Sequence, residues 1–247
     1  ESSKGFAKSF MRRHGIPTAD FEVFTEVDAA VAYVRDLNRP CVVKADGLAA
    51  GKGVYVCDTP AEAEHVVRTM LTERVFGTAG QTVIVEERLS GREVSVLAFC
   101  DGTRVALMPP ARDHKRALDG DQGLNTGGMG AFTPVPDFSL EQLEWTRQAV
   151  LQPAIDGLRA EGTPFSGVLY AGLMLTPEGI KVLEFNCRLG DPETQVILPL
   201  LDFDLVEICL ACAEGRLDPA QIQWRHEACA AVVVASGGYP EKYPTGL

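Results

Sequence analysis

The segment Lys181-Val-Leu-Glu-Phe-Asn-Cys-Arg-Leu-Gly-Asp-Pro-Glu193 decides how this chain of 247 residues is understood. Its first half has the pattern of a β-strand, so the side chains of Glu184 and Asn186, two residues apart, leave the same face. A carboxylate and an amide oxygen on one rigid face suit Mg²⁺ that is also bound to substrate phosphates. Arg188 follows at once, where it can stabilise transferred phosphate charge. The segment therefore predicts a metal–nucleotide site with Glu184 and Asn186 as ligands.

A second candidate phosphate site is the stretch Lys44-Ala-Asp-Gly-Leu-Ala-Ala-Gly-Lys-Gly53. It is not a Walker A loop, because Asp46 stands where that motif has glycine and Gly53 where it has Ser or Thr. Such a loop between two strands can still fold its N–H groups over phosphates as a flap, while Lys44 and Lys52 neutralise charge. For this segment alone, a glycine hairpin with a solvated lysine stays open as the alternative.

A third element, Val83-Ile-Val-Glu-Glu-Arg-Leu89, predicts a strand that leads into a short connector. The main chain of such a connector can hydrogen-bond an adenine edge. Glu93 then lies where it can accept hydrogen bonds from ribose hydroxyls. Alone this signal is weak, because paired glutamates at a strand end are usually solvated.

Hydrophobic periodicity predicts mixed helices and mainly antiparallel hairpins, which together indicate an α+β fold. The expected helices are Lys4–His14, Ala30–Leu37, a capped helix from Thr59 to Leu71, Ser139–Arg159 with a kink at Pro153, and Asp204–Gly215. The expected strands are Cys41–Ala45, Val54–Cys57, Thr82–Glu87, Val94–Phe99, Val105–Met108, Val168–Thr176 and Ile180–Asn186. The stretch from Pro109 to Asp137 has no periodicity, and loops of this length are usually functional or disordered.

The composition is that of a globular protein, with 46% hydrophobic and 23% charged residues. A net charge of −11 leaves no basic excess to cover a nucleic-acid backbone, so no nucleic-acid partner is expected. No apolar run is long enough to span a bilayer, and no signal peptide is visible. We therefore expect a cytoplasmic protein that does not bind membranes.

The seven cysteines are an odd number and do not form the pattern of a secreted disulfide framework. Cys209 and Cys212, followed by His226 and Cys229, superficially resemble a four-ligand zinc site. We favour the alternative that they are small buried hydrophobes. In that interpretation Cys209 and Cys212 share the apolar stripe of a helix, and Cys229 opens a strand.

Several sequence motifs of this chain resemble those of a known family. Arg188-Leu-Gly-Asp-Pro-Glu-Thr-Gln-Val196 resembles the signature of the glycinamide ribonucleotide synthetase (phosphoribosylamine–glycine ligase) family, part of the ATP-grasp superfamily. Position 189 is Leu, where many relatives carry Phe. Further motifs resemble that family in the same order along the chain: Arg13–Thr18, Val43–Gly53, Met108–Arg116, Asn125–Gly130 and Leu169–Leu175. The resemblance spans essentially the whole chain.

The resemblance implies an ATP-grasp fold, in which two α+β subdomains grip ATP between them. It assigns residues 1–226 to this domain, with a lid subdomain at about residues 20–89. Residues 227–247 are then expected to begin a carboxy-terminal domain that is incomplete. The family's amino-terminal domain is expected to be absent, so this fragment alone is expected to lack much of its second-substrate side.

The resemblance also implies a reaction in de novo purine biosynthesis. ATP phosphorylates glycine to glycyl phosphate, and the amine of 5-phosphoribosylamine displaces phosphate to give glycinamide ribonucleotide. ATP with Mg²⁺ or Mn²⁺ is implied as the cofactor set. Fusion to, or association with, other purine-biosynthesis enzymes is implied for the parent chain.

The family's functional residues carry over to matching positions of this chain. The implied metal ligands are Glu184 and Asn186, and the residues expected to stabilise transferred charge are Arg188, Lys44 and Lys52. The implied ATP-binding residues are Lys4, Lys44, Lys52, Gly53, Glu86, Glu87, Arg88, Leu89 and Glu93. The implied substrate-side wall contains Arg112, Asp113, His114, Lys115, Asn125, Thr126, Gly127 and Asp191.

Two alternatives remain open. Another ATP-grasp ligase with a different carboxylate substrate would share the lysine loop and the pair Glu184 and Asn186, but less readily the signature at 188–196. A regulatory or scaffolding module would bind the nucleotide without catalysis, and the intact ligand pair argues against it.

Overall fold

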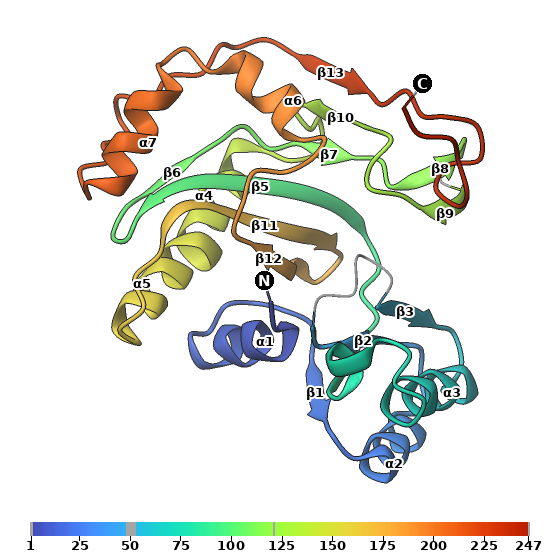
Figure 1. Ribbon diagram of the computed structural model, residues 1–247. Helices are drawn as coiled ribbons and strands as arrows, with labels where there is room; N and C mark the ends of the chain where they lie inside the picture. Colours follow the sequence, from blue (N-terminus) through green and yellow to red (C-terminus); the bar gives the residue numbers. More distant parts are fainter. Residues whose placement is uncertain (1, 48–52, 121, 247) are drawn as a thin grey trace. The chain divides into compact units, whose positions relative to one another are not determined.

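The computed structural model describes residues 2–47, 53–120 and 122–246 (Figure 1). Two compact units make up the chain. Unit 1 comprises Glu1–Gly91 and Thr176–Glu184, and unit 2 comprises Arg92–Leu175 and Phe185–Leu247. Both units combine helices with antiparallel sheets, so the predicted α+β class is confirmed. The predicted domain boundaries at 226/227 and at about 20–89 remain predictions.

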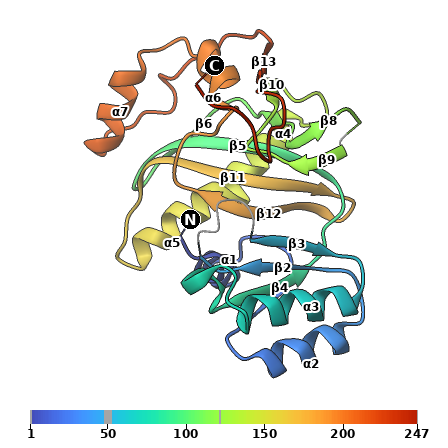
Figure 2. The same cartoon turned by 45° about the vertical axis from the view of Figure 1, so that its right-hand side comes forward.

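Unit 1 is built on a four-stranded antiparallel sheet of order β1-β4-β2-β3. Its strands are β1 (Phe21–Phe24), β2 (Cys41–Ala45), β3 (Val54–Cys57) and β4 (Val83–Glu87). Helices α2 (Val27–Leu37) and α3 (Pro60–Leu71) cover one face of this sheet (Figure 2) and form one hydrophobic core with it. Helix α1 (Lys4–Arg13) lies against the opposite face, where it meets β4.

Side-chain caps fix where the helices of unit 1 begin. The hydroxyl of Ser3 accepts a hydrogen bond from Phe6 N at 3.0 Å, which satisfies an N–H group of the first turn of α1. The predicted capping box of α3 is confirmed, because Thr59 and Glu62 each accept from the other's backbone N–H. At the other end of α2, Asn38 adopts the left-handed conformation that stops a helix.

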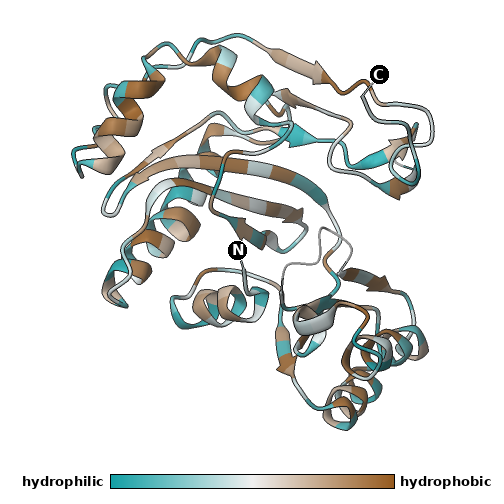
Figure 3. Cartoon of the chain, viewed as in Figure 1, coloured by the Kyte–Doolittle hydropathy of each residue, from teal (hydrophilic) through white to brown (hydrophobic). Residues whose placement is uncertain are grey.

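Unit 2 contains the longest strands of the described chain. Its strand β5 (Arg92–Asp101) pairs with β6 (Val105–Leu107) and with β11 (Ser166–Thr176). The sheet order is β12-β11-β5-β6, and β12 (Gly179–Asn186) belongs to unit 1 as far as Glu184. β5 is hydrophobic along most of its length (Figure 3), and its residues from Val94 to Asp101 are all buried. Figure 1 shows α4 (Leu140–Thr146) and α5 (Gln152–Ala160) on one side of β5 and β11, with α6 (Thr194–Ile197) and α7 (Leu205–Ala213) on the other.

The stretch from Pro109 to Asp137 is less irregular than its sequence suggests. It contains four short strands: β7 (Arg112–Asp113), β8 (Arg116–Leu118), β9 (Gln122–Asn125) and β10 (Gly130–Thr133). β10 lies between β7 and β13 (Cys229–Val232) in a second sheet, and β8 pairs with β9. Strands of two to four residues are too short to show an alternating pattern, so periodicity did not reveal them.

One local prediction is confirmed and another is wrong. The helix predicted over Ser139–Arg159 runs without a break from Leu140 to Ala160 and contains a π-helical turn, Arg147–Leu151, just before Pro153. A π-helical turn departs from the usual i→i−4 hydrogen bonds, which accommodates a residue without an N–H. The stripe predicted on α7 is wrong at Cys209, which is exposed, whereas Ile208 and Cys212 are buried. In the described part of the chain, no helix combines the length and apolar character needed to cross a membrane.

Candidate functional site

Two lysines of unit 1 share one carboxylate on the sheet face that meets α1. Lys8 Nζ lies 2.7 Å from Glu86 Oε2, and Lys44 Nζ contacts Glu86 Oε1. These side chains are buried, with residue exposures of 3% for Lys8, 3% for Glu86 and 9% for Lys44. Burial lowers the pKa of Lys8, and the nearby carboxylate of Glu86 opposes this effect. Buried charges persist where they are paired, so these three groups form one structural unit.

Lys4 belongs to the same electrostatic environment. Its ammonium donates to the carbonyls of Ala45 and Gly47, each at 3.0 Å, at the end of β2. Burial lowers the pKa of Lys4, whereas the charge of Glu184 raises it and that of Lys44 lowers it further. The structure thus gathers three predicted site residues, Lys4, Lys44 and Glu184, around one region of unit 1.

Asp46 fixes the start of the glycine-rich loop against α1. Its Oδ1 accepts hydrogen bonds from Ser3 Oγ at 3.0 Å and from Gly5 N at 2.6 Å. Gly47 follows, and a Cβ there would lie 2.8 Å from Ala79 Cβ, so only glycine allows this approach. Lys52 lies outside the described residues, while Gly53 is buried and its carbonyl accepts from Ala45 N at 2.8 Å.

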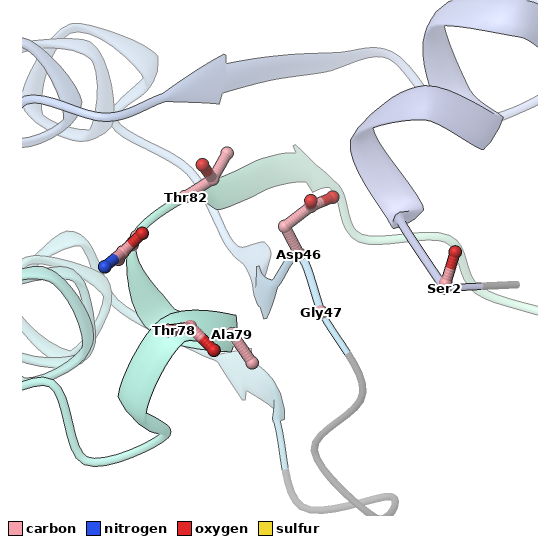
Figure 4. A pocket seen from close by; sticks show the side chains of 7 residues that line it. Ser2, Asp46, Gly47, Thr78, Ala79 and Thr82 are labelled. Atoms are coloured by element: carbon pink, nitrogen blue, oxygen red, sulfur yellow. The ribbon is translucent and has the colours of Figure 1, made fainter.

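A cavity of about 360 Å³ lies beside this loop (Figure 4). Its seven lining residues are Ser2, Asp46, Gly47, Thr78, Ala79, Gln81 and Thr82. Among these described residues the charged side chain is the carboxylate of Asp46, which would repel a polyphosphate. We therefore do not assign the nucleotide phosphates to this cavity.

The predicted adenine connector has its acidic side chains engaged elsewhere. Glu86 is paired with the two lysines, and Glu87 Oε2 lies 3.0 Å from Lys181 Nζ. Burial raises the pKa of Glu87, but the hydrogen bond and charge of Lys181 outweigh it, so the net shift is downward. Arg88 pairs with Asp58. The side chains of this connector are thus tied within unit 1, which leaves its main chain as the candidate contact to a base.

The candidate metal ligands stand on a strand, as predicted. β12 runs over Gly179–Asn186 and carries Glu184 and Asn186 two residues apart, with Glu184 exposed and Asn186 half-buried. Their carboxylate and amide oxygens are donors that suit Mg²⁺. Among the described residues, no three or more His, Cys, Asp or Glu side chains lie close enough together to bind one metal ion. An ion held by Glu184 and Asn186 would take its remaining ligands from phosphate and water. Arg188 is exposed, and its Nη1 donates to Leu189 O at 2.9 Å.

Within unit 2, the structure brings together three residues predicted for ribose and substrate contacts. Lys115 Nζ lies 2.6 Å from Glu93 Oε2 and 3.7 Å from Asp113 Oδ2. Burial raises the pKa of Asp113, Lys115 opposes this, and the charges of Glu193 and Glu93 add to it. The cluster therefore holds more carboxylates than ammonium groups, an arrangement that suits a ligand with a positive charge.

Backbone hydrogen bonds hold the predicted substrate loop at Asn125–Gly130 against this cluster. Thr126 N donates to Lys115 O at 2.7 Å, and Met129 N donates to His114 O at 2.7 Å. Gly127 N donates to the hydroxyl of Tyr239 at 3.0 Å. His114 is exposed, with its ring 5.8 Å from that of Phe132. The loop is thus held partly by Tyr239, a residue that no sequence motif identified as part of the site.

Arg112 links the start of β5 to the loop before α4. Its guanidinium makes two hydrogen bonds to Asp137, at 2.7 and 2.9 Å, and its Nε donates to Glu93 O at 2.8 Å. The bidentate bond to Arg112 lowers the pKa of Asp137. Arg112 thus connects the backbone of Glu93 to the carboxylate of Asp137, and its predicted place on the substrate side remains a prediction.

A buried hydrogen-bond network is centred on Glu193, at the end of the segment 181–193, and it was not predicted from the sequence. Glu193 Oε1 accepts from Tyr170 Oη at 2.5 Å and from Ser95 Oγ at 3.1 Å, and all three residues are buried. Asp191, predicted on the substrate side, is exposed and accepts from Gln195 Nε2 at 2.6 Å. No sequence signal connects Ser95 with Glu193, because the partners lie on separate elements far apart in the chain.

Comparison with known proteins finds sequences similar to the whole chain. Residues 2–194 match the model of the phosphoribosylglycinamide synthetase ATP-grasp (A) domain. The chain is 52% identical to phosphoribosylamine–glycine ligase of Allochromatium vinosum over 247 residues, all of this chain and 58% of that protein. It is 55% identical to trifunctional purine biosynthetic protein adenosine-3 of Gallus gallus over 249 residues, all of this chain and 25% of that protein.

A solved structure supports the same match. The crystal structure of phosphoribosylamine–glycine ligase from Thermotoga maritima superposes with a TM-score of 0.89 at 36% identity, covering 99% of this chain and 61% of that one. The chain therefore spans between a quarter and about three fifths of these relatives.

Proposed function

The chain belongs to the phosphoribosylglycinamide synthetase family and has its ATP-grasp fold, and from this premise we propose that it supplies the nucleotide-binding part of a phosphoribosylamine–glycine ligase. In the proposed reaction, a carboxylate oxygen of glycine attacks the γ-phosphorus of ATP and ADP leaves. The amine of 5-phosphoribosylamine then attacks the carbonyl carbon of glycyl phosphate, and inorganic phosphate leaves. The observation that carries this proposal is that the ammonium groups of Lys4 and Lys44 lie in unit 1 near the carboxylate of Glu184.

The phosphate-binding part of the proposal rests on Lys4, Lys44 and Lys52, with Arg188 acting on the transferred group. Phosphoryl transfer depends mainly on positioning and charge stabilisation, so lysines and an arginine can perform it without a catalytic base. Lys4 and Lys44 are held by backbone carbonyls and by Glu86, which restricts their motion before the nucleotide arrives. Such preorganisation lowers the reorganisation required during the reaction.

Glu184 and Asn186 would hold Mg²⁺, since their oxygens fit this ion. Bound there, Mg²⁺ would neutralise charge on the nucleotide phosphates. Adenine and ribose contacts are assigned to the main chain of Glu86–Leu89 and to Glu93. An amide in place of a second carboxylate keeps the site less negative, which favours an anionic nucleotide.

The substrate side is assigned to unit 2. Asp113 and Lys115 form its charged pair, and the loop Asn125–Gly127 lies beside them. The carboxylate of Asp113 suits the ammonium group of glycine, so we assign the amino acid to this side. His114 and Asp191 are both exposed. We assign them to the substrate side as well.

The wider setting is also part of the proposal. One relative is a trifunctional purine biosynthetic protein, which supports fusion or association with other purine-biosynthesis activities. Cytoplasmic location is proposed on the same ground. The oxygen donors suit either Mg²⁺ or Mn²⁺.

The test is an activity assay on the intact protein. With ATP, glycine, 5-phosphoribosylamine and Mg²⁺, we expect stoichiometric ADP, phosphate and glycinamide ribonucleotide, measured by coupled ADP release and by mass spectrometry. Glu184→Ala and Asn186→Ala should each lower kcat/KM by about a hundredfold or more. Glu178→Ala removes an exposed carboxylate from the same β11–β12 hairpin and serves as the matched control.

Two results would overturn the proposal. Phosphate release with another small acid, but none with glycine, would contradict the assigned substrate. Binding of Mg-ATP without ADP formation in the presence of both substrates would point to a nucleotide-binding module. Full activity of both alanine variants would contradict the metal assignment alone.

A further inference from the structure

Lys8 is a buried lysine whose role is not explained by the sites assigned above. It lies on α1, is 3% exposed, and its Nζ is 2.7 Å from Glu86 Oε2 and 2.7 Å from Thr18 Oγ1. The hydroxyl of Thr18 in turn donates to Val182 O at 2.6 Å. Lys8 therefore joins α1 to β4 and, through Thr18, to β12, the strand that carries Glu184.

Among the described residues, the ammonium groups of Lys8 and Lys44 both contact the carboxylate of Glu86, and the charge of Glu184 also acts on Lys8. Removal of Lys8 would take one positive charge from this group. It would also leave Lys44 as the ammonium that pairs with Glu86. A buried carboxylate without a counter-ion is strongly unfavourable, so Glu86 would then retain Lys44.

We propose that Lys8 is a positioning residue: it neutralises Glu86, so that Lys44 can direct its charge to the phosphates of a nucleotide. This inference rests on the proposed nucleotide binding and extends it to a residue that is not among the proposed nucleotide contacts. Glu86 pairs with both Lys8 and Lys44. When a nucleotide binds, Lys8 remains paired with Glu86 and Lys44 interacts with the phosphates.

The inference is tested by binding measurements on the intact protein with three probes: Mg-ATP, inorganic tripolyphosphate and adenosine. Lys8→Met keeps a long apolar side chain and removes the charge. We expect it to weaken ATP and tripolyphosphate binding about tenfold or more, because a unit charge near a polyphosphate has a large effect in a partly buried site. Adenosine carries no phosphate, so its affinity should stay unchanged.

Two further variants separate charge from folding. Lys8→Arg retains the positive charge and should restore most of the ATP affinity. Arg35→Met removes one positive charge from the surface of the same unit, where Arg35 pairs with Glu64, and should leave all three affinities unchanged. Thermal unfolding of each variant verifies that the protein compared is folded.

The outcomes distinguish this inference from the proposed function. If the wild-type protein binds neither Mg-ATP nor tripolyphosphate, the proposed function fails. If the wild type binds both and Lys8→Met binds them equally well, the role of Lys8 is refuted. Equal weakening of adenosine and ATP would likewise refute it, because a purely structural defect would affect both probes.

Discussion

The carboxylate of Glu193 accepts a hydrogen bond from the phenol of Tyr170, with 2.5 Å between Tyr170 Oη and Glu193 Oε1. Tyr170 lies on β11, and Ser95 on the neighbouring strand β5 adds a second hydrogen bond at 3.1 Å. Burial and the negative charge of Glu193 raise the pKa of Tyr170, so its hydroxyl remains a donor at neutral pH. Through these bonds the turn that follows Arg188 is attached to the central sheet of unit 2.

Tyr170→Phe should destabilise the protein. The substitution keeps the ring but removes the donor, which leaves a buried carboxylate with Ser95 as its remaining partner in this network. We expect a loss of about 1–3 kcal/mol in the free energy of unfolding. Urea denaturation of the intact protein, followed by circular dichroism, measures it.

The control for this prediction is Tyr55→Phe. Tyr55 is 40% exposed on β3, so removal of its hydroxyl should change the unfolding free energy by less than about 0.5 kcal/mol. Equal stability of Tyr170→Phe and the wild type would show that the bond to Glu193 makes no net contribution.

Gly190→Ala should destabilise the same turn by displacing the side chain of Glu193. A Cβ at Gly190 would lie 2.5 Å from Glu193 Oε2 and 2.9 Å from its carboxyl carbon, so the buried side chain would have to move. We expect a cost of about 1–3 kcal/mol, in the range of other overpacked sites. Gly237→Ala is the matched control, because a Cβ there meets nothing within 4 Å. A stable Gly190→Ala variant with wild-type spectra would mean that the turn tolerates displacement of Glu193.

Much of the local structure could be predicted because its signals are short-range. The capping box at Thr59 and the end of the helix at Leu37 each involve residues within one or two turns. The prediction that Glu184 and Asn186 lie on one strand, two residues apart, is also confirmed. The family resemblance added the fold, which neither periodicity nor composition could specify.

Long-range partners could not be predicted in this way. Lys8 looks like an ordinary helix residue in the sequence, and its burial depends on Glu86, which lies on a different element of unit 1. Tyr239 and Gly127 are likewise brought together by the folded chain. A single sequence records which groups are present, but pairing across elements is decided by packing.

Asp137→Asn should change how stability depends on pH. Arg112 lowers the pKa of Asp137 in the folded protein, so the ionised carboxylate contributes stability above its unfolded pKa, about 3.9, and loses it as pH falls through the folded value. At pH 7 we expect Asp137→Asn to cost about 1–2 kcal/mol, since Asp137 is partly exposed. The difference from wild type should shrink below about pH 4.

Unfolding measured from pH 7 down to pH 3 examines this prediction. Asp119→Asn changes an exposed carboxylate of the same unit and should alter stability little at any pH. A cost for Asp137→Asn that is constant across the range would mean that the ionised form of Asp137 gains nothing from Arg112.

Tyr239→Phe should weaken substrate binding while leaving the nucleotide unaffected, provided that the proposed function holds. Its hydroxyl accepts from Gly127 N at 3.0 Å, and that loop contains the proposed contacts Asn125 and Thr126. Loss of one hydrogen bond corresponds to about a three- to tenfold rise in KM for glycine or 5-phosphoribosylamine, with KM for ATP unchanged. Tyr243→Phe keeps the edge-to-face contact with Tyr239, at 5.1 Å between ring centroids, and should behave as wild type. Unchanged KM values for both substrates in Tyr239→Phe would show that this loop needs no support from Tyr239.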